Sequence, residues 1–113
     1  MESIKKLLEK PKTLEDLGTD EKSLLLYLET RAVDHGGAVN AQHMNPHDMK
    51  IAEGWTLSGF VEFGRIRFED MRRLKSSHWV VLSPEAWALA HEERRARGKR
   101  MWEKRSWLKA REK

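Results

Sequence analysis

The last 23 residues combine cations with tryptophan, a combination suited to binding a polyanion. From His91 to Lys113 the sequence has ten Lys or Arg and four Glu, whereas residues 1–90 carry 12 basic and 14 acidic side chains. Lys and Arg bind phosphate oxygens, and an indole ring can stack on an unpaired base. The sequence therefore predicts a near-neutral body with a tail that contacts a polyanion.

Several interpretations of this tail remain open. As a phosphate-binding arm it would use its cations, while as a docking helix it would use Met101, Trp102 and Leu108, which share a helical stripe, and Trp107, which lies off it. Alternatively, its tryptophans fold back over the domain's own core. We favour an interaction role, because polar tails rarely carry two tryptophans without burying them. The candidate cations are Arg94, Arg95, Arg97, Lys99 and Arg100.

A second group of cations lies within eleven residues of the body. On a hairpin, Arg65 and Arg67 would point to one face, ready for phosphates or a minor groove. The alternative is a charged strand edge that discourages pairing with other chains. The group consists of Arg65, Arg67, Arg72, Arg73 and Lys75, opposed by Glu69 and Asp70.

Polar side chains around a predicted helix over 46–58 could approach DNA bases. They are Asn40, Gln42, His43, His47 and Lys50. Such side chains read base edges in a major groove. An ordinary polar helix face is the alternative, and we favour it slightly for base specificity, because Lys50 is the only Lys or Arg on that face and Glu53 opposes it.

The sequence offers no convincing catalytic or metal-binding pattern. It has no Cys, no Gly-rich phosphate loop and no nucleophile elbow. The spacing of His35, His43 and His47 is a weak metal signal. We therefore expect neither an enzyme nor a bound metal or cofactor. The aromatic residues Trp55, Phe60, Phe63 and Trp87 are instead predicted to be core.

Local signals predict the elements of the first half. A short amphipathic helix is expected over 3–10, and a stronger one over 21–34, capped by Thr19 or Asp20 and ended by Gly36-Gly37. A short strand over 38–39 and a helical turn over 40–44, capped by Asn40, follow. Asn45 and Pro46 then open the helix over 46–58, which Gly59 closes.

The second half is predicted to form a hairpin followed by a helix. A strand over 60–68 bends or bulges at Gly64, and the polar segment after it contains a helical turn capped by Asp70. A second strand spans 78–82. Ser83-Pro84-Glu85 opens the last helix, which Gly98 weakens.

This order of elements resembles a winged helix-turn-helix domain over roughly 19–97. Leu82-Ser-Pro-Glu-Ala-Trp-Ala-Leu-Ala90 resembles the Leu-Thr-Pro-Glu-Gly-x-x-Leu-Ala ending of many wings, and Trp55-Thr-Leu-Ser-Gly-Phe-Val61 resembles the passage into the wing. The resemblance implies a mainly α chain with a small β-hairpin (α+β), with 46–58 as the recognition helix. An N-terminal arm with short helices (1–18) and a basic, Trp-containing C-terminal extension (98–113) would flank that domain.

The resemblance and the cations together predict a DNA-binding protein, sequence-directed or general. Its size and basic arm are similar to those of phage and mobile-element proteins, which suggests a transcriptional regulator. The alternative is a protein-interaction module or homodimer whose C-terminal tail docks on a partner; binding of single strands through the tail is a weaker third interpretation. No stretch approaches the ~20 apolar residues of a membrane span, so we expect a cytoplasmic protein without a membrane partner.

A mutational comparison separates the two basic regions. If the hairpin is the principal contact, replacing Arg65, Arg67, Arg72 and Arg73 with Ala abolishes duplex DNA binding, because the phosphate-binding cations are lost. If truncation after Arg97 abolishes binding instead, the tail is the principal contact. Fluorescence anisotropy with a labelled duplex measures both, and binding that survives both changes contradicts both assignments.

Overall fold

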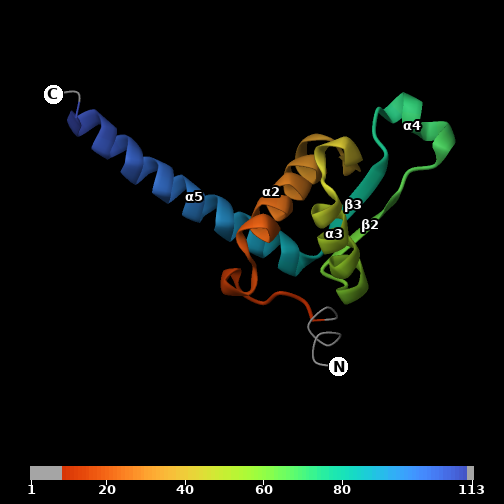
Figure 1. The fold of residues 1–113 in the computed structure, drawn as a ribbon, viewed down its shortest axis with the longest axis horizontal. Coiled ribbons are helices and arrows are strands. Elements are labelled where there is room, and N and C mark those ends of the chain that lie inside the picture. The colour runs from red at the N-terminus through yellow and green to blue at the C-terminus, as the bar shows by residue number, and fades with distance from the viewer. Residues whose placement is uncertain (1–8, 112–113) are drawn as a thin grey trace.

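The computed structural model describes residues 9–111, with side chains to residue 105. The chain is mainly helical with a small three-stranded antiparallel sheet, which confirms the α+β part of the predicted fold class (Figure 1). The predicted helix over 3–10 lies almost entirely outside the described residues. In chain order the elements are η1 (Leu14–Asp16), α2 (Thr19–Asp34), β1 (Ala38–Val39), η2 (Ala41–His43), α3 (Pro46–Ser58), β2 (Val61–Arg65), α4 (Phe68–Leu74), β3 (His78–Leu82) and α5 (Pro84–Arg111).

Helix α2 lies at the centre of the core. Its residues Leu24, Leu25, Leu26 and Leu28 are buried, and Leu25 and Leu28 are fully inaccessible to solvent. The helix begins at Thr19, and its N-cap is Gly18. The predicted cap at Thr19 or Asp20 was therefore wrong. The Glu21 carboxylate turns back to accept the Gly18 N–H at 3.3 Å, which satisfies an unpaired amide at the helix end.

Helix α3 has its predicted bounds. The Asn45 side chain accepts the Asp48 N–H at 2.7 Å, and the Asp48 carboxylate accepts the Asn45 N–H at 3.2 Å. Gly59 ends the helix in the left-handed region, with φ 80°. On the buried side, Trp55 packs edge-on against Phe60, with ring centroids 5.2 Å apart. This packing fixes α3 against the start of β2.

The sheet has the order β1-β3-β2, and β3 lies between the two other strands. The ladder between β2 and β3 runs in continuous register from the Val61–Leu82 pair to the Arg65–His78 pair. The predicted bulge at Gly64 is therefore wrong. Gly64 lies opposite Trp79, and a Cβ atom at Gly64 would come within 2.6 Å of the indole ring. The glycine makes room for the ring.

The tip of the hairpin is a helix rather than a continuation of the strand. β2 ends at Arg65, so the predicted strand to Phe68 was too long, and Phe68 begins α4 with 87% of its surface exposed. The N-cap of α4 is Arg67. The prediction that Asp70 caps this turn was also wrong, because Asp70 lies in the first turn and its carboxylate binds the side chains of Arg67 and Arg73.

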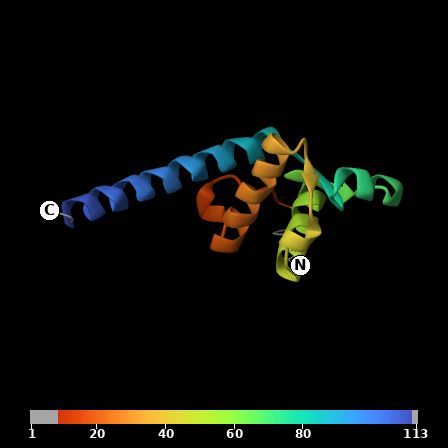
Figure 2. The same ribbon diagram turned by 90° about the horizontal axis from the view of Figure 1, so that it is seen from above.

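Helix α5 continues through Gly98 as one helix of 28 residues. Its first half packs on α2 and also contacts β3 and η1. Its second half runs away from the body, so that its far end and α4 lie at opposite ends of the molecule in both views (Figures 1 and 2). Trp87 in its first turn is 39% exposed, which contradicts its predicted place in the core. We call residues 98–111 of α5 the arm.

Gly37 is predicted to be essential for the sheet. Its φ is 90°, and an added Cβ would lie 2.8 Å from the Val80 carbonyl oxygen, which belongs to the backbone of β3. Gly37→Ala should lower the free energy of unfolding by about 2 to 4 kcal/mol, through backbone strain and overpacking. Chemical denaturation measures this change.

Gly98→Ala is the matched control. Nothing lies within 4 Å of a Cβ added at Gly98, and the residue is inside α5. This substitution should raise stability by up to about 1 kcal/mol, through helix propensity alone. Equal effects of the two substitutions would contradict the structure at Gly37.

Candidate nucleic-acid interface

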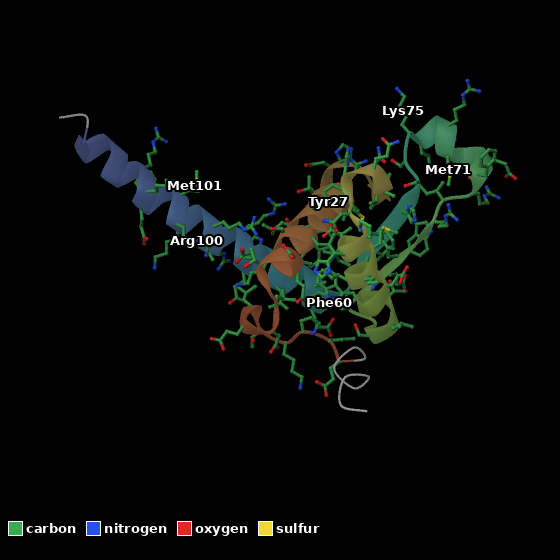
Figure 3. All side chains as sticks on the ribbon, viewed as in Figure 1. Tyr27, Phe60, Met71, Lys75, Arg100 and Met101 are labelled. Carbon is green, nitrogen blue, oxygen red and sulfur yellow. The ribbon has the colours of Figure 1, made fainter. Side chains whose placement is uncertain are left out.

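The hairpin tip, residues 65–75, concentrates cations on α4 and its flanks. The Asp70 carboxylate lies 3.1 Å from Arg67 and 3.4 Å from Arg73. The hydrogen bond from Arg67 holds the pKa of Asp70 below its usual value, so this carboxylate stays ionised at neutral pH. Arg65, Arg72 and Lys75 are exposed and form no ion pair with another described residue. The tip therefore retains a positive surface, with Lys75 at its outer end (Figure 3).

Arg65 and Arg67 are not related as the sequence analysis expected. Since β2 ends at Arg65 and Arg67 caps α4, the two do not alternate along one strand. They nevertheless line the same hollow, together with Trp79.

Several of the predicted base-reading residues form contacts with other side chains or backbone groups of the chain. Asn40 caps η2 by accepting the Gln42 N–H at 2.9 Å, and the Nδ1 atom of His43 lies 2.8 Å from the Tyr27 hydroxyl. His47 lies 3.6 Å from the Asp20 carboxylate at the start of α2. Gln42 and Lys50 are exposed. Of these residues, His47 lies beside an acidic group, and Asn40 and His43 are engaged within the chain.

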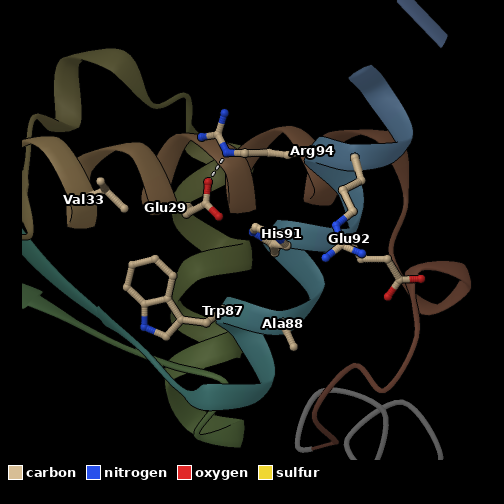
Figure 4. A pocket seen from close by; sticks show the side chains of 8 residues that line it. Glu29, Val33, Trp87, Ala88, His91, Glu92 and Arg94 are labelled. Carbon is tan, nitrogen blue, oxygen red and sulfur yellow. Dashed lines mark hydrogen bonds and ion pairs between the residues drawn. The ribbon is translucent and has the colours of Figure 1, made fainter. Parts of the chain in front are cut away.

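The Arg94 side chain links α5 to α2. Its guanidinium forms an ion pair with Glu29, which is only 6% exposed (Figure 4). It also donates to the Leu26 carbonyl at 3.1 Å and to the Thr30 hydroxyl at 2.6 Å. A buried carboxylate needs such a partner, because desolvation penalises an unpaired charge. Arg94 therefore has a structural role that leaves little of its guanidinium for phosphate.

A second buried carboxylate belongs to Glu93, the residue that precedes Arg94 on α5. Glu93 is 2% exposed, and it accepts hydrogen bonds from Arg97 at 2.7 Å and Arg100 at 3.4 Å. Arg97 also reaches the Ser23 hydroxyl at 3.3 Å, which ties α5 to α2 again. Burial acts to raise the pKa of Glu93, but the hydrogen bond from Arg97 and the nearby cations outweigh it and lower the pKa. The carboxylate therefore neutralises part of the α5 charge.

Beyond this anchor the α5 side chains are exposed to solvent. Arg95 and Lys99 are exposed, as are Lys104 and Arg105. Met101 and Trp102 are 67% and 68% exposed, and Arg100 and Met101 lie on the projecting part of the helix (Figure 3). The side chains of Trp107 and Leu108 lie outside the described ones, so the complete predicted stripe is not visible. The described part of the arm does not fold back over the core.

Two important side chains were missed by sequence reasoning. The sequence gives Glu29 no role beyond its place in the predicted helix over 21–34. Its partner Arg94 is 65 positions away, so no local pattern joins them. Trp79 is 40% exposed on the outer face of the sheet, because His78, Val80 and Leu82 occupy the inner face. The sequence of 78–82 does not alternate between apolar and polar residues, so it carries no signal that places Trp79 outside.

Among the side chains of residues 9–105, no group of three or more His, Asp or Glu is placed to hold a metal ion. No α-helix within the described range combines the length and apolarity needed to cross a bilayer. Comparisons of the chain with protein-family models, with curated proteins and with solved structures gave no match.

Substitution of Arg94 should lower stability far more than substitution of its neighbour Arg95. Arg94→Ala leaves the buried Glu29 carboxylate without its cation, so the free energy of unfolding should fall by about 2 to 3 kcal/mol. Arg95→Ala removes an exposed cation and should change stability by less than about 0.5 kcal/mol. Thermal or urea unfolding of the two variants measures the difference, and equal stability would contradict the structural role of Arg94.

Proposed function

We propose that the chain is a winged-helix protein that binds double-stranded DNA mainly through its phosphates. The main observation behind this proposal is that the cations at the start of α5 are bound within the chain, whereas most of those further along are exposed. Arg94 and Arg97 are bound to buried carboxylates. The arm carries six Lys or Arg and one Glu. Arg100 at its start also contacts Glu93, and the cations Lys99, Lys104 and Arg105 are exposed. A helix with this charge attracts the phosphate backbone and releases its counterions.

The order of elements supports a winged-helix arrangement. Helix α2, strand β1, the turn η2 and helix α3 precede a β2–β3 hairpin, which occupies the place of a wing. The hairpin departs from a simple wing by carrying α4 at its tip. In this arrangement the exposed cations of the tip would contact phosphates beside a groove, in the role that the sequence predicted for the wing.

We infer that binding is general rather than sequence-directed. On α3, Lys50 is opposed by Glu53, and Asp48 lies in the first turn. His47 faces Asp20. Phosphates of a duplex would meet these acidic groups as α3 entered the major groove, which weakens specific reading by this helix.

A second candidate function is protein interaction through the arm, favoured by the exposure of Met101 and Trp102. Pairing of two arms side by side in a homodimer would bring together two strongly cationic helices, which repel each other. A protein partner at the arm would therefore need to be acidic. Light scattering with and without the arm tests whether the arm mediates self-association.

The proposed function predicts a steep dependence of DNA affinity on salt. Affinity for a roughly 20-base-pair duplex should fall about 1,000-fold between about 50 and 200 mM salt, as expected for about six phosphate contacts. Replacing Lys99, Lys104 and Arg105 with Gln should make the slope of log K against log salt shallower by about 2 to 3, because each lost contact removes about 0.9. Fluorescence anisotropy measures both values.

Lys50→Gln is the control for the arm. It removes an exposed cation from α3, and under the proposed phosphate contacts it changes the slope by less than about one. No binding at low salt would overturn the proposal. An unchanged slope in the triple variant would show that the arm is not the source of affinity.

A further inference from the structure

The outer face of the sheet presents an aromatic platform. Trp79 points away from the core, and its indole lies across Gly64 on the neighbouring strand. The glycine presents no side chain there, so the ring can lie against the strand while 40% of the Trp79 surface remains exposed. Such an exposed ring can stack on another planar group.

Trp79 is also a wall of a solvent-open hollow between the sheet and the hairpin tip. Ile66 and Leu74 add apolar surface, and the turn at Gly36 and Gly37 closes one side. Arg65 and Arg67 line the same hollow. Asp70 lies there too, but it is bound to Arg67 and Arg73. The hollow thus combines a flat apolar surface with cationic groups.

We propose that this hollow binds one unpaired nucleobase of a single-stranded nucleic acid. The base stacks on Trp79, and its flanking phosphate binds Arg65 and Arg67. Stacking on an aromatic side chain suits any base, and arginine holds the backbone beside it. This site goes beyond duplex binding, because base faces inside a duplex are covered by their neighbours and cannot reach the indole.

The charge of the hollow favours a nucleic acid over a protein segment as its occupant. An apolar peptide could cover Trp79 and Leu74, but it would leave the Arg65 guanidinium beside it without an anionic partner. A nucleotide satisfies both parts at once, since its base is planar and its phosphate is anionic. Single-stranded DNA and RNA share this chemistry.

The test compares two tryptophans of nearly equal exposure. Trp79 is 40% exposed in the hollow, and Trp87 is 39% exposed on α5, outside it. Trp79→Val, which keeps a residue suited to a strand, should weaken binding of a roughly 12-nucleotide oligo(dT) or oligo(rU) by about 5- to 150-fold. Its affinity for a matched duplex should change less than about twofold, because the phosphate contacts remain. Trp87→Leu should leave both affinities unchanged.

Every other outcome decides for or against the base site, and some also decide whether duplex binding stands. Equal losses for single strand and duplex, or no loss for either, overturn the base site. If the unaltered protein binds duplex but no single strand, the base site fails while the proposed DNA-binding function stands. If single strands bind in a Trp79-dependent manner and duplex does not, the base site stands and duplex binding fails. A change from dimer to monomer in Trp79→Val, seen by light scattering, would make the hollow a protein contact and overturn the inference.

Photocrosslinking tests the site without a substitution, should Trp79→Val fail to fold. The unaltered full chain is irradiated with an oligonucleotide carrying 5-iodouracil, and the adduct is located by peptide mass. We expect the adduct at Trp79. Adducts confined to Trp102 or Trp107 would assign base stacking to the arm and overturn the inference.

Discussion

Two buried carboxylates on facing helices determine the shape of this molecule. Glu29 of α2 and Glu93 of α5 are 6% and 2% exposed, and each is neutralised by arginines of α5. Removing a carboxylate from water is costly unless a cation and hydrogen bonds compensate it. Arg94 binds across the helix pair, and Arg97 also contacts Ser23 on α2, so the pairing fixes the direction in which α5 leaves the body.

The same junction determines which cations of α5 remain for a partner. Arg94 and Arg97 of the anchored half are bound within the chain. Arg95 and, beyond Gly98, Lys99, Lys104 and Arg105 are exposed to solvent. The hairpin tip carries further exposed cations at the opposite end of the long axis (Figure 2). The molecule is 57 Å in its longest dimension, the length of roughly 17 base pairs of duplex. The arm and the hairpin tip of a single molecule are therefore far enough apart to contact separate phosphates of one duplex.

Local signals predicted most elements because the responsible contacts are local. The cap formed by Asn45 and Asp48 and the left-handed Gly59 depend on residues within a few positions, and α3 matches its predicted bounds. The predicted end of the first hairpin strand was wrong, because β2 ends where α4 begins. Trp79 was not placed on the outer face, and the exposure of Trp87 depends on how α5 packs on α2. The ion pair of Glu29 with Arg94 joins residues far apart in the sequence, so it requires the tertiary structure.

The division of α5 into an anchored half and a nucleic-acid-binding arm is tested most directly by hydrogen exchange. In the free protein the amides of residues 98–111 should exchange at least about tenfold faster than those of 84–97, because tertiary packing protects only the anchored half. Saturating duplex DNA should slow exchange in the arm and leave the anchored half unchanged. Equal protection of both halves in the free protein, or an arm that duplex DNA leaves unaffected, would contradict this division.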